Sequence, residues 1–196
     1  MPHAINDEAL DAIFRAARTQ NKWLDKPVST AHLMAIYDLM RWGPTSANVS
    51  PARFVYLVSS VAKERLKPHL LPSNVEKVMT SSATVIIGYD LDFPELIPRL
   101  FPHNPGAKGW FQNPALREAT AFRNGSLQGA YFIIAARALG LDCGPMSGFN
   151  NAAVDQEFFS GTNVKSNFLC AIGHGDPSGV MARSPRLSFD EACKIL

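Results

Sequence analysis

Three separated polar segments contain the side chains and turns that could bind a phosphorylated, polyhydroxylated ligand. They cover residues 17–23, 43–51 and 140–149. Each segment alone could be only a turn, because Ser, Thr and Asn near Gly or Pro are typical of turns. Together with Arg183 and Arg186 they supply backbone amides, hydroxyls and guanidinium groups. A guanidinium makes two charge-assisted hydrogen bonds to a phosphate, so the combined set suits a flavin nucleotide.

Motifs that would indicate other chemistry are missing. The sequence has no Gly-x-Gly-x-x-Gly, P-loop, Gly-x-Ser-x-Gly or His-Glu-x-x-His. The five histidines and three cysteines have no metal-ligand spacing, so no metal site is predicted. Cys143 has no histidine near it in the sequence, which disfavours a nucleophilic thiol. An enzyme without these groups needs a cofactor that brings its own reactivity, and no catalytic side chain is assigned.

Composition excludes several classes of protein. The 196 residues are 46% hydrophobic and 18% charged, which is enough apolar material for a core and rules out a disordered chain. A net charge of +2 without a polybasic segment argues against nucleic-acid or membrane-surface binding. Neither a signal peptide nor a membrane span is recognisable, so we expect a cytoplasmic protein with reduced thiols. No repeat or long linker interrupts residues 1–196, which predicts a single domain.

The hydrophobic periodicity predicts the helices that must position these segments. Helices are expected over about residues 7–21, 29–43 and 114–139, with a last one starting at Ser188. In the long helix, Asn113 is the expected N-cap and Pro114 the first residue. Its inward face is expected to carry Leu127, Tyr131 and neighbouring apolar residues.

Strands are predicted over residues 53–59, 84–89 and 168–172, which are rich in β-branched and aromatic residues. Residues 142–149 are expected to form a tight turn. Residues 102–114 are expected to form a loop whose Trp110 and Phe111 suit a lid or an interface.

At this level the chain resembles the FMN-dependent nitroreductases, essentially from end to end. The resemblance rests on residues 42–48 (WGPTSAN), 120–124 (TAFRN), 137–142 (RALGLD) and 144–149 (GPMSGF), in this order. It looks closest to the branch that contains the malonic semialdehyde reductases of pyrimidine breakdown, whose members are often labelled NADH dehydrogenase/NAD(P)H nitroreductase. The resemblance implies an α+β nitroreductase-like fold, with a small, mostly antiparallel sheet between helices. Three readable strands are few for a monomer core, so we expect a homodimer with the long helix at its interface.

The resemblance also implies a set of cofactor-binding residues. The positions that match FMN contacts of the family are Arg18, Thr19, Pro44, Thr45, Ser46, Asn48, Asn74, Lys77, Pro145, Met146, Ser147, Gly148 and Arg186. Residues 18–19 and Arg186 would hold the phosphate and ribityl chain, and residues 44–48 would reach the flavin from the partner subunit. Asn74 and Lys77 would bind the pyrimidine edge, and the amides of residues 145–148 would face N5.

Some positions depart from the family pattern. Asn21 and Ser184 stand where the family has basic residues, and Ser50 stands where a Gln is usual. Arg183 is our own addition to the site, as a substitute for the charge missing at position 184. Two plain alternatives remain open at the level of sequence: Lys77 as an exposed helix residue and Arg183 as a surface charge.

The implied activity is an FMN-dependent oxidoreductase, in which NADH or NADPH passes hydride to flavin N5 and a small acceptor then takes it. The branch suggests malonic semialdehyde reduced to 3-hydroxypropionate, although no proton donor for a carbonyl is evident in the sequence. The alternatives are a nitro or quinone reductase of broad specificity, a flavin-binding protein without turnover, and a flavin-consuming or dehalogenating relative.

Overall fold

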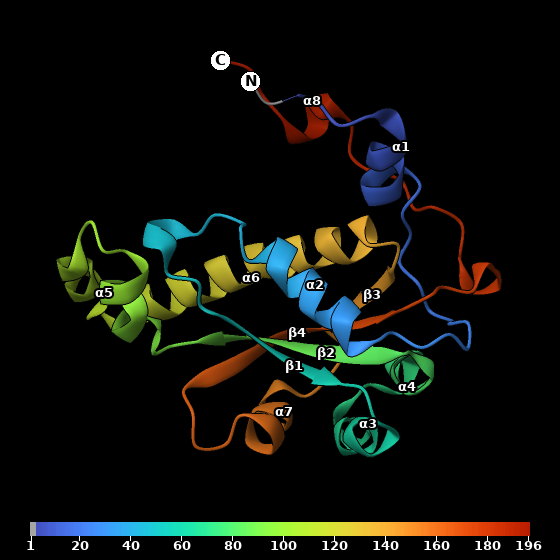
Figure 1. The fold of residues 1–196 in the computed structure, drawn as a ribbon, viewed down its shortest axis with the longest axis horizontal. Coiled ribbons are helices and arrows are strands. Elements are labelled where there is room, and N and C mark those ends of the chain that lie inside the picture. The colour runs from blue at the N-terminus through green and yellow to red at the C-terminus, as the bar shows by residue number, and fades with distance from the viewer. Residues whose placement is uncertain (1–2) are drawn as a thin grey trace.

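A four-stranded antiparallel sheet lies at the centre of the computed structural model, which describes residues 3–196 (Figure 1). The strand order is β1-β2-β4-β3, and every neighbouring pair is antiparallel. The strands are β1 (Ala52–Leu57), β2 (Ala83–Asp90), β3 (Asp142–Met146) and β4 (Val164–Gly173). The mostly antiparallel sheet of an α+β protein is therefore confirmed.

Helices cover both faces of this sheet. The α-helices are α1 (Asp7–Leu10), α2 (Thr30–Met40), α3 (Ser60–Leu66), α4 (Pro72–Thr80), α5 (Ile97–Leu100), α6 (Pro114–Ala138), α7 (Asn151–Phe158) and α8 (Phe189–Ala192). The pair α2 and α6 lies on one face, and α3, α4 and α7 lie on the other (Figure 1). No helix within residues 3–196 combines the length and the apolar character that crossing a bilayer requires.

Alternation along the central strands explains the three layers. In β2, Val85 and Ile87 pack toward α2 and α6, whereas Ile86 packs toward α3, α4 and α7. In β4, Cys170 and Leu169 divide in the same way. Successive side chains of a strand point to opposite faces. A run of apolar residues in a central strand therefore contributes side chains to the hydrophobic cores on both faces of the sheet.

The ends of α6 and α8 are as predicted. The Asn113 side chain accepts hydrogen bonds from the amides of Ala115 and Leu116 at the start of α6. Ser188 and Glu191 form a capping box at the start of α8. Both caps satisfy amides that have no partner inside the helix.

The predicted helix over residues 7–21 is wrong in length. Regular α-helix ends at Leu10, and a π-helical turn continues over Asp11–Arg15. Thr19 then forms a bridge with Cys143, and the amide of Gln20 donates to the Cys143 carbonyl at 3.0 Å. Pairing with the edge of the sheet thus overrides the helical periodicity beyond residue 15.

The predicted tight turn over residues 142–149 is also wrong, because its first part is the edge strand β3. Pro145 argues against a strand at the level of sequence, because proline lacks the backbone amide that a central strand needs for pairing. An edge strand tolerates proline. The prediction of a loop over residues 102–114 missed a 3₁₀ helix at Pro105–Phe111. In this helix, the Phe111 ring packs edge-on against the Phe93 ring, with the two ring centroids 4.9 Å apart. Trp110 is 55% exposed.

The long helix buries a different face from the one predicted. Gly125, Gln128, Gly129 and Phe132 are buried, whereas Leu127 and Tyr131 are 46% and 37% exposed. A Cβ on Gly129 would lie 2.5 Å from Cζ of Phe168, so the helix approaches the sheet through its small residues. Leu127 and Tyr131 are left on the outer side.

Candidate functional site

The first cluster of predicted site residues lies at the β3 edge of the sheet. Asn74 donates from Nδ2 to the Gly148 carbonyl at 3.0 Å, which joins α4 to the segment after β3. Trp23 donates from Nε1 to the Lys77 carbonyl at 2.9 Å. Gly144 lies so close to this helix that a Cβ on it would be 3.1 Å from Cδ of Lys77. The fold therefore brings together residues 18–23, α4 and residues 144–148, which the sequence separates widely.

Lys77 is the cation of this cluster. Its side chain is 9% exposed, which overturns the alternative of an exposed helix residue. Its Nζ makes no hydrogen bond or ion pair within residues 3–196. Burial lowers the pKa of Lys77, because water is removed from around the charged ammonium. Lys77 also lines a cavity of about 460 Å³, together with Asn21, Asn74 and Met181.

Two backbone amides lie in the segment after β3, which Asn74 of this cavity contacts at Gly148. The amides of Ser147 and Gly148 have no acceptor within the described part of the chain, whereas the Gly148 carbonyl is bonded to both Leu71 and Asn74. Met146 is buried under them as the last residue of β3, after the half-buried Pro145. The segment after β3 thus presents unpaired donors on a fixed backbone.

The second cluster is the segment that holds Pro44, Thr45, Ser46 and Asn48. Ser46 donates its amide to Asn124 of α6 at 2.9 Å, and Thr45 Oγ1 accepts from the amide of Ser50. Ala47, Asn48 and Ser50 have φ values of 46°, 52° and 40°. Non-glycine residues rarely adopt such left-handed conformations, and they are concentrated at functional sites.

These two clusters lie toward opposite ends of α6 (Figure 1). The segment between α2 and β1 runs near α5, whereas α4 and β3 lie toward the other end. No residue is shared between the cavity that contains Lys77 and the cavity that contains Pro44 and Asn48. The residues of these two clusters therefore lie in two separate places within one protomer.

The C-terminal arginines occupy a third place. Arg183 donates to the carbonyls of Arg15 and Ala17, which ties the tail to the residues just before Arg18. Arg18 in turn donates to the Met181 carbonyl. Arg186 is exposed and bonds only to the neighbouring carbonyls of Ser184 and Pro185. The guanidinium of Arg186 is therefore not engaged by any other element.

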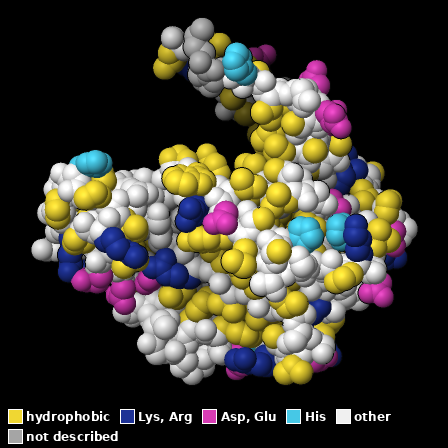
Figure 2. All heavy atoms as spheres, in the orientation of Figure 1, with side chains coloured by type: hydrophobic (Ala, Val, Ile, Leu, Met, Phe, Trp, Pro, Cys, Tyr) yellow, Lys and Arg dark blue, Asp and Glu magenta, His cyan; other side chains and the backbone are white. Residues whose placement is uncertain are grey.

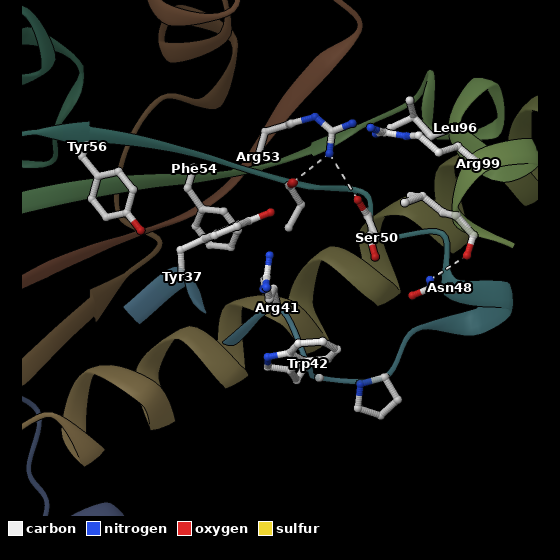
Figure 3. A pocket seen from close by; sticks show the side chains of 14 residues that line it. Tyr37, Arg41, Trp42, Asn48, Ser50, Arg53, Phe54, Tyr56, Leu96 and Arg99 are labelled. Atoms are coloured by element: carbon white, nitrogen blue, oxygen red, sulfur yellow. Dashed lines mark hydrogen bonds between the residues drawn. The ribbon is translucent and has the colours of Figure 1, made fainter. Parts of the chain in front are cut away.

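Sequence reasoning missed a further cavity, of about 800 Å³, next to the second cluster (Figure 3). Arg41, Arg53 and Arg99 line it together with several aromatic rings. These residues come from α2, β1 and α5, and no motif links them. The sequence does hold one signal for its support: Asn124 and Gln128 are polar residues four apart on the buried face of α6, and they accept from the amides of Ser46 and Ala52.

Within residues 3–196, no group of three or more His, Cys, Asp or Glu side chains is placed so that it could hold a metal ion. The three cysteines are free, and Cys143 is buried without a histidine partner.

Curated relatives match this chain over nearly its whole length. A protein from Cupriavidus pinatubonensis is 57% identical over 192 residues, which cover 96% of this chain and 98% of the relative. One from Stenotrophomonas maltophilia is 58% identical over 196 residues, covering all of both chains. Both are provisionally named NADH dehydrogenase/NAD(P)H nitroreductase.

Solved structures and a family model agree with these relatives. A crystal structure from Exiguobacterium sibiricum, provisionally described as a nitroreductase in complex with FMN, superimposes with a TM-score of 0.86 at 18% identity over all of both chains. A nitroreductase-type structure from Bacillus subtilis gives 0.85 at 20% identity, covering 97% of this chain and 100% of the other. The model of the nitroreductase family matches residues 4–175. The chain therefore belongs to the nitroreductase family.

Proposed function

We propose that this protein is an FMN-dependent NAD(P)H oxidoreductase, working as a homodimer of one FMN-binding domain per chain. The observation that carries the proposal is Lys77, whose side chain is largely buried and whose Nζ, at the cavity, has no partner among the described residues. A largely buried lysine without an anionic partner is unfavourable, so its position favours an anionic ligand in the adjoining cavity. The name of the relatives and the FMN in the Exiguobacterium structure support the same conclusion.

The donor set fits the cofactor. A flavin ring offers acceptor atoms along its edge. Lys77 in the cavity would supply a donor to it, together with the amides of Ser147 and Gly148, which have no acceptor within the described residues. The phosphate needs charge-assisted donors, and Arg186, which within the described residues bonds only to neighbouring carbonyls, would supply them. Arg18 and Arg183 are tied to the same tail, and Thr19 follows Arg18 in the chain. Asn74 is committed through its Nδ2 to Gly148, which leaves its Oδ1 as an acceptor.

A second copy of this chain completes the site. Residues 44–48 lie too far along α6 to share a cavity with Lys77, so one flavin contacts both clusters only when they come from different protomers. The exposed apolar side chains of α6, including Phe122, Leu127 and Tyr131, form a surface that a partner would cover. Hydrophobic side chains also gather on the surface in the middle of the view in Figure 2. On α2, Met34 and Tyr37 are exposed. We refer to these residues of α2 and α6 as the α2–α6 face.

Bound FMN would supply the hydride chemistry by accepting a hydride from NADH or NADPH and passing it to a second substrate. The chain itself orients the ring and provides the electrostatic field. The Lys77 ammonium would stabilise negative charge on the ring edge, and the amides of Ser147 and Gly148 would be donors for N5. The left-handed residues Ala47, Asn48 and Ser50 hold their segment in a defined shape. In the proposed dimer, this segment would form the wall of the flavin site of the other protomer.

For the acceptor, we propose malonic semialdehyde, reduced to 3-hydroxypropionate, on the resemblance to that branch. Nitro or quinone compounds are the second candidate, supported by the nitroreductase names of the relatives. Steady-state rates with NADH and each acceptor separate the two, and a protein that binds FMN without any turnover would be a flavin carrier.

The proposal is tested by the visible spectrum of protein that has been supplemented with FMN and desalted. We expect flavin bands that persist after desalting and bleach on anaerobic addition of NADH. A colourless protein would refute the FMN site, and bands that NADH leaves unchanged would refute the oxidoreductase.

Removing the guanidinium of Arg186 is expected to weaken FMN binding by about 1.5–3 kcal/mol, the usual contribution of hydrogen bonds to charged groups. The measurement is a fluorescence titration of FMN with the Arg186→Ala variant. Because Arg186 bonds only to adjacent carbonyls, the fold should be unaffected. Lys194→Ala removes one charge from the same exposed tail and is the control. Equal affinity of Arg186→Ala and wild type would remove Arg186 from the site.

A further inference from the structure

The cavity beside the second cluster is positively charged and aromatic (Figure 3). Three arginines line it and no Asp or Glu does. Its rings are those of Tyr37, Trp42, Phe54 and Tyr56. A volume of about 800 Å³ is in the range of small-molecule sites.

The three arginines differ in how far their charge is compensated. Arg53 is held by Asp90 at 2.6 Å and donates to the carbonyls of Ser50 and Ala52. Arg41 lies over the ring of Trp42, with its Nε 3.9 Å from Asp38, too far for a hydrogen bond. These two are anchored on the walls of the cavity.

Arg99 has no such compensation. It makes no hydrogen bond or ion pair within the described residues, and the acid one turn before it, Glu95, is paired with Lys108. The side chains of Arg53 and Arg99 point toward one another across the cavity (Figure 3). Two converging cations repel each other, and an anion between them would remove that repulsion.

A second group in the same cavity also lacks a partner. The hydroxyl of Tyr56 is buried and has no hydrogen-bond partner within residues 3–196. Burial raises the pKa of Tyr56 to about 12, so the hydroxyl stays protonated and remains a donor at neutral pH. A buried hydroxyl is normally satisfied, so its isolation points to a ligand that accepts from it.

The cavity is joined directly to the proposed flavin wall. Asn48 donates from Nδ2 to the carbonyl of Leu100 at 2.7 Å, and Leu100 follows Arg99 in α5. Pro44 and Asn48 themselves line the cavity. Arg99 is thus positioned by the same segment that would contact the partner's FMN.

We propose that this cavity binds the anionic oxygen group of a small unsaturated acceptor, and that Arg99 is the residue that selects for this group. The inference rests on the proposed function, because it assigns the substrate class of the same flavin site. Arg99 would make the charge-assisted bonds, the aromatic rings would pack against the planar part of the acceptor, and the Tyr56 hydroxyl would donate a further hydrogen bond. The phosphates of NADH are the other source of the same anionic chemistry.

The test compares 4-nitrobenzoate with 4-nitrobenzamide, which share the ring and the nitro group and differ in charge. In both, the nitro group takes up two electrons and two protons from NADH and solvent, and nitroso product and water leave. For Arg99→Ala we expect KM for 4-nitrobenzoate to rise about 10- to 100-fold with little change in kcat. KM for 4-nitrobenzamide and for NADH should stay within about twofold of wild type. Arg99→Lys should recover part of the loss, because a lysine keeps the charge without the planar fork.

Arg65→Ala is the control, since it removes one arginine from α3, on the opposite face of the sheet, and should leave the ratio of the two KM values unchanged. An unchanged ratio in Arg99→Ala would overturn the proposal. A rise in KM for NADH with equal effects on both acceptors would overturn it in favour of a dinucleotide phosphate.

Calorimetric titration of the FMN-supplemented protein with benzoate and benzamide provides a readout that is independent of turnover. We expect benzoate to bind more tightly than benzamide in the wild type and the preference to disappear in Arg99→Ala. If this preference is present but no flavin is retained, the proposed oxidoreductase fails and the anion site stands. If flavin is retained and reduced by NADH but the preference is absent, the anion site fails alone.

Discussion

Leu127→Asp is expected to separate the two protomers and to abolish FMN binding at the same time. Leu127 is 46% exposed on the outer side of α6, within the α2–α6 face. In a symmetric dimer the same patch is used by both subunits, so the substitution introduces two carboxylates into one apolar interface. Burial of an unpaired charge costs several kcal/mol, so two such charges in one interface should disfavour association strongly.

The loss of FMN follows from the division of the site. In the proposed dimer, a monomer would keep Lys77 and the amides of residues 147–148 but would lack the wall that residues 44–48 of the other protomer are proposed to form. We expect FMN affinity to fall by at least about 100-fold, the equivalent of roughly 2.7 kcal/mol. Sedimentation gives the molecular mass, and fluorescence titration gives the affinity for the same samples.

Val61→Asp is the matched control. Val61 is 72% exposed on α3, which packs on the other face of the sheet. It should remain dimeric and keep its FMN. A Leu127→Asp variant that stays dimeric would place the interface elsewhere. A monomer that binds FMN as tightly as the wild type would contradict the shared site.

The elements that the sequence predicts well are those with local signals. The Asn113–Pro114 start of α6 and the Ser188 capping box depend on residues within one helical turn, and both occur as expected. The central strands β2 and β4 contain apolar stretches at residues 84–89 and 168–172, which are enough to recognise them without knowing their partners. The polar residues 165–167 at the start of β4 lie outside the predicted range.

The secondary-structure predictions fail where contacts between residues distant in the sequence determine the structure. β3 contains Gly144 and Pro145 and is a strand only because β4 pairs with it, and the helix at residues 7–15 ends because Thr19 pairs with Cys143. The predicted face of α6 is wrong for another reason. The prediction places the larger apolar side chains inward, whereas Gly125 and Gly129 are buried because the sheet approaches the helix closely.

The candidate site also contains residues that the sequence predicts and residues that it does not. The resemblance identified Lys77 and residues 145–148, and the structure places them beside one another. Arg99 carries no local signal, since it is one exposed arginine in a four-residue helix. Its position next to Asn48 depends on a hydrogen bond between residues 52 positions apart, which no single-sequence pattern contains.

Lys77→Met is expected to stabilise the flavin-free protein and to make the bound flavin harder to reduce. Methionine keeps an unbranched apolar chain in the buried position and removes an ammonium that has no partner within the described residues. Replacing an unfavourable buried charge typically adds about 0.5–2 kcal/mol to the free energy of unfolding. The gain should depend on pH in a defined direction.

That direction follows from the lowered pKa of Lys77. Below the lowered pKa, both the folded and the unfolded chain hold the proton, and the cost of the buried charge is fully present. Between that value and the ordinary 10.5, unfolding takes up a proton, so the stability of the wild type rises with pH. The advantage of Lys77→Met, measured by urea unfolding, should therefore be largest near pH 7 and shrink as the pH approaches 10.5.

With FMN bound, the same substitution should have the opposite consequence for function. An ammonium about 4 Å from a developing negative charge contributes up to about 4 kcal/mol at an effective dielectric constant near 20. Losing about 2–4 kcal/mol lowers a two-electron potential by roughly 40–90 mV. Lys63→Met is the control, because Lys63 is also buried but donates to the carbonyls of Met79 and Ser81. It should lose stability, since those carbonyls become unpaired, and leave the flavin potential unchanged. A Lys77→Met protein with the potential of the wild type would show that Lys77 does not act on the flavin.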